Sequence, residues 1–249
     1  MKGLMDENLK RKIWQIIKKE MGKAYTDRVH GEKHIRGVYK NFLVLLESKP
    51  KIKKEILEAL EYAAMLHDIG RKKVQSEKHG KESVKMIKRM GIKLPGKELI
   101  LYAITWHSDA GKIFGKKNSI PPKGKNKWIC LALLVLLDHM DATGKEGVKR
   151  LKDYVHFTLK KPVFPIKGEN IRYMEKEILR KWFDDPKREN ISEKDKNNSL
   201  LENVMYNYFW IDKNITRSNG LIPKSFEKRY RKDGQELRNF ALKLIDKNG

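Results

Sequence analysis

The chain has 249 residues, of which 35% are charged and 39% hydrophobic, a composition that suits a protein of amphipathic helices. Its one cysteine, Cys130, excludes an internal disulfide and lies in an apolar stretch, so catalysis by this thiol is not expected. The longest apolar run, residues 129–137, is far shorter than the roughly 20 residues that cross a bilayer, and the N-terminus lacks a signal-peptide core, so we expect a cytoplasmic protein and no membrane partner.

The net charge of +24 is the second strong feature of the composition. Such an excess of lysine and arginine indicates a polyanionic partner, with nucleic acid as the leading candidate. A generally solvated cationic surface explains the charge almost as well. The oligomeric state cannot be derived from these features.

Hydrophobic periodicity predicts an all-α chain, in which His34 starts the second helix and the doublet of His67 and Asp68 ends the third. The third helix is apolar along its second half, so the doublet is expected at the edge of a dry core. We expect Gly70 to end this helix in the left-handed conformation. The predicted helices of this part of the chain cover residues 8–21, 34–46, 53–67, 77–90, 97–106 and 128–142.

The later helices of this group also carry polar residues at their ends or within an apolar stretch. His79 lies in the first turn of the fourth helix, where Ser76 is a possible N-cap, and His107 follows the end of the fifth. Asp138 lies inside the sixth, an apolar helix. Side chains at the ends and inner faces of successive apolar helices are what a site inside a helical bundle requires.

The rest of the chain is predicted to form two polar segments and further helices. Residues 111–127 contain six lysines and no acid, and they connect the helices that carry His107 and Asp138. They are either a solvated loop or a cationic lip that gathers phosphates. The segment 184–199 is expected to be a surface connection. Residues 154–158 read as a possible short strand, and helices are expected over residues 173–183, 200–211 and 225–247.

The order of these polar residues resembles the HD-domain phosphohydrolase superfamily over roughly residues 25–145. A lone His-Asp doublet is a weak signal, because a buried histidine is more often a hydrogen-bonded core residue than a ligand. Here a histidine precedes the doublet and an aspartate in an apolar helix follows it. The motifs that carry the resemblance are His34-Ile35-x-x-Val38, Leu66-His67-Asp68-Ile69-Gly70-Arg71 and Leu137-Asp138-x-x-Asp141-Ala142-x-Gly144.

The resemblance implies a divalent metal site made by His34, His67, Asp68 and Asp138. Many members of the superfamily hold a second metal through further histidines between the doublet and the last aspartate. His79 and His107 stand where such ligands are expected. The chain departs from the single-metal nucleotidases, which often carry a glutamate shortly after the doublet, whereas Arg71 and Lys72 follow it here.

The proposed ligand set favours a transition metal, because imidazole suits manganese, iron, cobalt, nickel and zinc, whereas magnesium prefers oxygen. One or two ions are expected. Two ions roughly 3.5–4 Å apart can stabilise both the attacking and the leaving oxygen of a phosphoryl transfer. In that case Asp68 is the natural bridge, and the nucleophile is metal-bound hydroxide. The first ion then takes His34, His67 and Asp138, and the second takes His79 and His107.

Several further residues are candidates for catalysis or substrate binding. Arg71 and Lys72 follow the doublet and are expected to hold the substrate phosphate, although solvent exposure is an equal possibility. His30 is a substrate contact or a helix cap. Asp141 is expected to orient a ligand histidine without binding metal. The lysine-rich segment offers the remaining candidates for substrate binding, Lys112, Lys116 and Lys117.

The sequence therefore predicts an HD-domain helical bundle over residues 1–146, which carries the metal site, and a basic C-terminal helical extension over residues 147–249, packed on the core. The predicted activity is hydrolysis of a phosphomonoester or phosphodiester in a nucleotide or nucleic acid, with nuclease, phosphodiesterase and nucleotide phosphatase unresolved. Two other classes stay open. They are a nucleic-acid-binding module with a vestigial HD site, and a structural helical scaffold with coincidental histidines.

Overall fold

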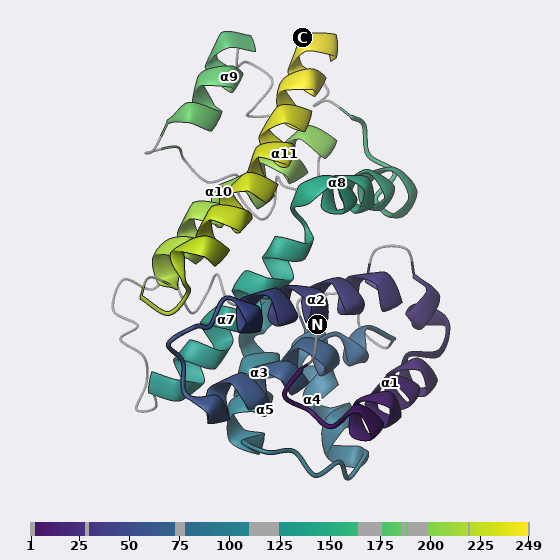
Figure 1. Cartoon of the computed structure of the whole chain (residues 1–249). Helices are drawn as coiled ribbons and strands as arrows, with labels where there is room; N and C mark the ends of the chain where they lie inside the picture. The colour runs from purple at the N-terminus through teal and green to yellow at the C-terminus, as the bar shows by residue number, and fades with distance from the viewer. Residues whose placement is uncertain are drawn as a thin grey trace. The chain divides into compact units, whose positions relative to one another are not determined.

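A computed structural model of the whole chain describes residues 3–27, 30–72, 78–109, 125–163, 176–185, 188, 199–218 and 220–248 (Figure 1). Within these residues the chain is helical and contains no strand, which confirms the all-α prediction. The chain divides into two compact units, Met1–Asp138 with Arg217–Phe226, and His139–Thr216 with Glu227–Gly249. Among the described helices, none is both long and apolar enough to cross a membrane. The predicted domain boundary at residue 146 remains a prediction.

The first unit is built from helices that follow the predicted ones closely. Short 3-10 turns extend several of them, and the last residues of the sixth helix, α7, fall in the second unit. The α-helices are α1 (Glu7–Met21), α2 (Glu32–Glu47), α3 (Lys54–Leu66), α4 (His79–Arg89), α5 (Lys97–Trp106) and α7 (Lys125–Asp141); the 3-10 turns are η1 (Gly22–Thr26), η2 (Ile69–Lys72) and η3 (His107–Asp109).

The centre of this unit is occupied by α3 and α7, which are apolar nearly all round. Every residue from Ala59 to Leu66 and from Leu131 to Leu137 is buried, which is the environment that such helices require. α3 packs against both α2 and α5, and α4 packs against α5 and η2. Asn41 of α2 donates a hydrogen bond to the Leu137 carbonyl of α7, at 3.0 Å. The ends of four helices thus converge around the last turns of α3 and α7.

One carboxylate in this core, that of Glu61 on α3, ties the N-terminal residues to the bundle. Its Oε2 atom accepts hydrogen bonds from the backbone N–H groups of Leu4 and Met5, at 2.9 and 2.8 Å. Its Oε1 atom accepts a hydrogen bond from the Tyr39 hydroxyl of α2, at 2.9 Å. Because Glu61 is only 1% exposed, these three donors replace the water that an ionised carboxylate otherwise requires.

Two local predictions are wrong. Gly70 does not end α3 in a left-handed conformation, since α3 ends at Leu66 and Gly70 lies inside η2 without a positive φ. Glycine is needed there for another reason, because a Cβ atom would lie 2.4 Å from the Ser83 nitrogen and 2.6 Å from the His79 oxygen. Residues Tyr154–Thr158 form a π-helical turn that continues a helix, so they are not a strand.

The second unit is a separate helical assembly with an aromatic core. Tyr208 packs against Phe183 and Trp182, with ring centroids 5.2 and 6.5 Å away, so this ring is part of the aromatic core. Several of the basic residues are paired with acids, as Arg238 is with Asp184. The helices of this unit are α8 (Gly144–Asp153), the π turn η4 (Tyr154–Thr158), α9 (Lys176–Asp184), α10 (Leu200–Arg217) and most of α11 (Lys224–Asn248).

Candidate metal centre

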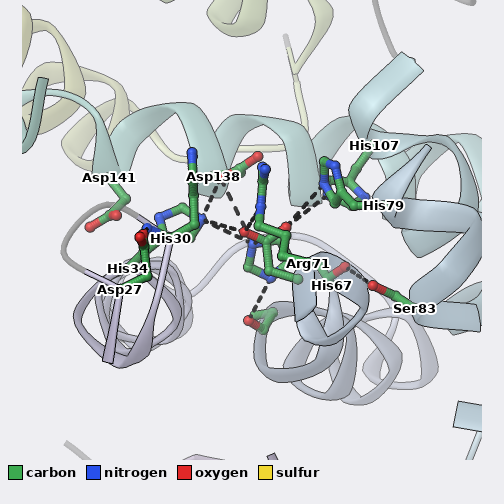
Figure 2. A network of polar contacts seen from close by, with 12 residues as sticks. Asp27, His30, His34, His67, Arg71, His79, Ser83, His107, Asp138 and Asp141 are labelled. Atoms are coloured by element: carbon green, nitrogen blue, oxygen red, sulfur yellow. Dashed lines mark hydrogen bonds and ion pairs between the residues drawn. The ribbon is translucent and has the colours of Figure 1, made fainter. Parts of the chain in front are cut away.

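Six side chains from five parts of the first unit converge on one buried cluster (Figure 2). Each comes from a helix end or from the inner face of a buried helix, so the backbone holds it in place. Five of them are at most 6% exposed, and the Asp138 side chain is 23% exposed. The cluster consists of His34 in the first turn of α2, His67 at the end of α3, Asp68 in the following turn, His79 at the start of α4, His107 after α5, and Asp138 in α7.

One part of the cluster joins α2, α3 and α7. His34 Nε2 lies 3.2 Å from His67 Nε2 and 3.2 Å from Asp138 Oδ1. The third distance, from His67 Nε2 to Asp138 Oδ1, is 3.9 Å. One ligand atom from each residue can therefore face a common centre, and all three lie within 4.8 Å of one another. The predicted ligands of the first ion are thus brought together.

The other part surrounds Oδ1 of Asp68. His79 Nε2 lies 3.0 Å from this oxygen and His107 Nε2 lies 3.6 Å from it. The Nε2 atoms of His79 and His107 are 2.9 Å apart. The second oxygen, Oδ2, faces His34 Nε2 at 3.4 Å and also binds Arg71. The two oxygens of one carboxylate therefore point to different histidines, as a bridging ligand requires.

Backbone carbonyls fix the orientation and the tautomer of two of the rings. Nδ1 of His67 lies 3.1 Å from the Ala64 oxygen, and Nδ1 of His107 lies 2.7 Å from the Ile104 oxygen. A carbonyl oxygen only accepts, so Nδ1 is the donor and Nε2 of the neutral ring carries a lone pair toward the cluster. A ring nitrogen anchored in this way is the arrangement typical of histidines that bind metal.

Burial keeps two of the histidines neutral, and neighbouring charges and hydrogen bonds keep the two aspartates ionised. Burial lowers the pKa of His67 to about 4 against the pull of Asp68 and Asp138, and it also lowers the pKa of His79. For Asp68, burial opposes ionisation, but Arg71 and the imidazoles outweigh it and hold the pKa well below its ordinary value. The pKa of Asp138 is lowered in the same way, mainly by its hydrogen bond from His34. His67 and His79 are therefore held neutral, and Asp68 and Asp138 ionised, which is the protonation state that binds a metal.

Asp68 Oδ1 provides a further test of whether the cluster fits a cation. Among the described residues this buried atom accepts no hydrogen bond of good geometry, although three imidazole nitrogens lie 3.0, 3.6 and 3.8 Å away. A buried ionised oxygen without a donor is costly. A divalent cation among these nitrogens and oxygens would satisfy it, so the residues present fit the metal that the sequence implies.

His30 lies directly beside this cluster. Its ring meets that of His34 edge-on at 5.7 Å between centroids, and His30, His34 and Asp68 offer ligand atoms within 4.8 Å of one another. Burial and the nearby Arg71 lower its pKa well below the ordinary value. His30 does not share a helix face with His34, because α2 begins at Glu32. Its role as a substrate contact remains a prediction, and the geometry makes it a possible ligand as well.

The remaining predicted residues are only partly described. Arg71 forms an ion pair with Asp68 and lies at the centre of the group of side chains in Figure 2. Lys72 ends η2, but its side chain, like the whole of Lys112, Lys116, Lys117 and the possible cap Ser76, lies outside the described residues. Asp141 forms an ion pair with Arg150 in the second unit, and the role we expected for it beside a ligand histidine stays a prediction.

Sequence reasoning missed the small residues that hold the cluster in place. Ser83 of α4 is fully buried, and its hydroxyl binds both ends of the turn that contains Asp68. Gly80 allows α4 to approach α5, since a Cβ atom there would lie 2.4 Å from the Ile104 oxygen. The sequence contains a signal for both residues, because Gly80 follows the candidate ligand His79 directly and Ser83 follows it by one helical turn.

Comparison with known proteins gives one result that agrees with this geometry. Residues 31–143 match the HD domain family, and this range includes all six clustered residues. No curated protein matches the chain significantly. No solved structure does so either. The chain therefore contains an HD domain over residues 31–143, as metal-dependent phosphohydrolases do, and this domain carries a buried cluster of histidine and aspartate.

Proposed function

We propose that the protein hydrolyses a phosphomonoester or phosphodiester of a nucleotide or nucleic acid with the help of two divalent ions. The observation that carries this proposal is that the two oxygens of the buried Asp68 carboxylate face different histidines. Oδ2 faces His34, whereas Oδ1 faces His79 and His107 and lies 3.8 Å from His67. A structural zinc site has four ligands around one ion, whereas six ligands that include a shared carboxylate suit a pair of ions.

The chemistry of the donors supports a transition metal. Four imidazole nitrogens and two carboxylates favour manganese, iron, cobalt, nickel or zinc over magnesium. His34, His67 and Asp138 would hold the first ion, His79 and His107 the second, and Asp68 both. When bound, such ions lower the pKa of water and neutralise charge on a phosphoryl group, which is the chemistry that hydrolysis requires.

The chain's own residues would orient the substrate and bind its charge. Arg71 places a guanidinium beside Asp68 at the cluster, where it can form a bidentate hydrogen bond with two oxygens of a phosphate. Lys72 and the lysines at positions 112, 116 and 117 are proposed to add positive charge around the entering phosphate. His30 is proposed to contact the substrate from the turn before α2.

A second candidate function is a nucleic-acid-binding module whose HD site no longer catalyses. The net charge of +24 favours it, because binding to a phosphate backbone depends on lysine and arginine. The six clustered residues favour the enzyme instead. A site without a function has no reason to keep four buried imidazoles and the buried Asp68 carboxylate, each of which costs stability unless it is satisfied.

An activity panel tests the proposal. The metal-free protein is loaded in turn with Mn²⁺, Co²⁺, Ni²⁺, Zn²⁺ and Mg²⁺ and given mononucleotides, cyclic dinucleotides, and single-stranded DNA and RNA. We expect hydrolysis of at least one class with a transition metal and little with Mg²⁺. Hydrolysis should disappear in His67→Ala and Asp68→Ala.

The same panel separates the two candidates. Nucleic-acid affinity that falls steeply with salt, without hydrolysis under any metal, would support the binding module and contradict the enzyme. Hydrolysis that survives in both variants would show that the cluster is not the active site. Mononucleotide hydrolysis without cleavage of polynucleotides would assign the enzyme to the phosphatases.

A further inference from the structure

Ser83 makes two hydrogen bonds that close the turn containing Asp68. Its Oγ donates to the His67 carbonyl at 2.6 Å, as Figure 2 shows. It also accepts the Gly70 N–H at 2.8 Å, so one hydroxyl joins both ends of residues 67–70. Ser83 is 0% exposed, so bulk solvent does not reach these two bonds. The serine lies on α4, one helical turn after His79.

The backbones around this serine are in very close contact. A Cβ atom on Gly70 would lie 2.4 Å from the Ser83 nitrogen, so the turn lies directly on α4. At the start of α4, a Cβ atom on Gly80 would lie 2.4 Å from the oxygen of Ile104, whose carbonyl also binds the His107 ring. α4 therefore touches the turn that carries Asp68 on one side and the end of α5 that carries His107 on the other.

We propose that Ser83 is a positioning residue that locks α4 onto the Asp68 turn and thereby sets the site of the second ion. This inference rests on the two-ion function proposed above. His79 comes from α4 itself and lies 3.0 Å from Asp68 Oδ1, so a shift of α4 changes this distance directly. None of His34, His67 and Asp138 is on α4.

The two ion sites therefore differ in their dependence on Ser83. The first site is built from α2, α3 and α7, and the His67 ring keeps its own anchor on the Ala64 carbonyl. The second site needs α4 at a fixed distance from residue 68. Loss of the serine hydroxyl should weaken the second ion selectively, by about tenfold to a hundredfold, as outer residues that orient metal ligands usually do.

The test is a titration of the full-length, metal-free chain with Co²⁺, followed by visible absorption and by calorimetry. Ser83→Ala removes both bonds, and Ser83→Thr keeps the hydroxyl as a conservative rescue. Ser48→Ala is the matched control, because the Ser48 hydroxyl also donates to a helical carbonyl at 2.6 Å, at the far end of α2. If Ser83→Ala does not fold, Ser83→Cys replaces it, since a thiol keeps the volume but bonds weakly.

We expect Ser83→Ala to bind the first Co²⁺ as the wild-type protein does and the second at least about tenfold more weakly. Ser83→Thr should regain most of the second affinity, and Ser48→Ala should match the wild type. The inference is overturned if Ser83→Ala binds both ions normally, or weakens both equally. A wild-type protein that binds no second ion contradicts the two-ion function itself, and this result is visible before any variant is measured.

Discussion

The Nε2 atoms of His79 and His107 lie 2.9 Å apart in the core of the protein. Because Nδ1 of His107 donates a hydrogen bond to the Ile104 carbonyl, Nε2 of the neutral His107 ring carries a lone pair. A contact this short between two imidazole nitrogens needs a shared proton or a cation between them. The nearby Asp68 carboxylate makes the cation the better occupant, because it adds an oxygen ligand 3.0 Å from His79.

The first prediction concerns His107→Ala. This change should remove one of the two proposed ions and leave the first, for which we propose His34, His67 and Asp138 as ligands. Hydrolysis should fall by more than about a hundredfold, the most that changes in outer residues usually cost. Plasma mass spectrometry counts the metal and a steady-state assay measures the turnover. His156→Ala, an exposed histidine in the second unit, is the control. Unchanged metal content in His107→Ala would remove this residue from the ligand set.

Arg71→Ala should separate metal binding from turnover. Its guanidinium binds the same Asp68 oxygen that faces His34, so its removal frees that oxygen for an ion. Co²⁺ should therefore bind no more weakly than in the wild type. Turnover should fall by about tenfold to a hundredfold, because a charged hydrogen bond to the phosphate is lost.

Two measurements decide the role of Arg71. Calorimetry gives the Co²⁺ affinity, and the assay gives kcat and KM. Arg36→Ala, a surface arginine paired with Glu32 on α2, is the matched control and should behave as the wild type. A loss of metal affinity together with activity in Arg71→Ala would mean that this arginine builds the site and does not act on the substrate.

Gly80→Ala should push α4 away from α5. The new methyl group would lie 2.4 Å from the Ile104 oxygen and 2.9 Å from the Thr105 oxygen, both backbone atoms that cannot turn aside. The distance between His79 and His107 should grow, and the second ion should be lost first. Gly91→Ala is the control at the other end of α4, where a Cβ atom meets nothing within 4 Å but φ is 61°.

The control should lose stability but not metal. Its left-handed conformation costs an alanine about 1 kcal/mol, which thermal unfolding detects. If Gly80→Ala binds both ions normally, the close approach of α4 and α5 is not what sets the second site.

The core and the helix order of the first unit were predictable from hydrophobic periodicity, because the second half of α3 and most of α7 are apolar and most of the candidate ligands fall at helix ends. The cluster itself was predictable from the order of His34, His67, Asp68 and Asp138. The close backbone contacts at Gly70 and Gly80 were not predictable, since glycine spacing does not say which backbone approaches which. For that reason, the prediction that Gly70 ends α3 in a left-handed conformation was wrong.

The buried acid Glu61 was missed for a similar reason. In the sequence it looks like one polar position of an amphipathic helix, because its partners Leu4 and Met5 lie more than fifty residues away. Long-range partners of this kind cannot be read from local periodicity. The same limit hid Ser83, whose two partners lie in the turn after another helix.

Tyr39→Phe should lower the free energy of unfolding by about 1.5 kcal/mol, because Glu61 loses one of its three hydrogen-bond donors. Burial and Glu61 raise the pKa of Tyr39 above its ordinary value of 10. A raised pKa in the folded state means that the unfolded chain ionises first, so the stability due to this group is present below about pH 10 and is lost as the pH rises further.

The variant should accordingly lose less stability between neutral and alkaline pH than the wild type. Urea unfolding at pH 7 and above pH 10 measures both effects. Metal content should be unchanged, since Tyr39 lies on α2 away from the ligand atoms. Equal stability of the two proteins at pH 7 would show that the hydrogen bond to Glu61 contributes nothing.

The most direct test of the two-ion site is electron paramagnetic resonance of the chain loaded with Mn²⁺. Two ions that share the Asp68 carboxylate are magnetically coupled and give a multiline spectrum, and Asp68→Asn should abolish this coupling. A wild-type spectrum of isolated Mn²⁺ alone, or a coupled spectrum that persists in Asp68→Asn, would contradict Asp68 as the bridge between two metals.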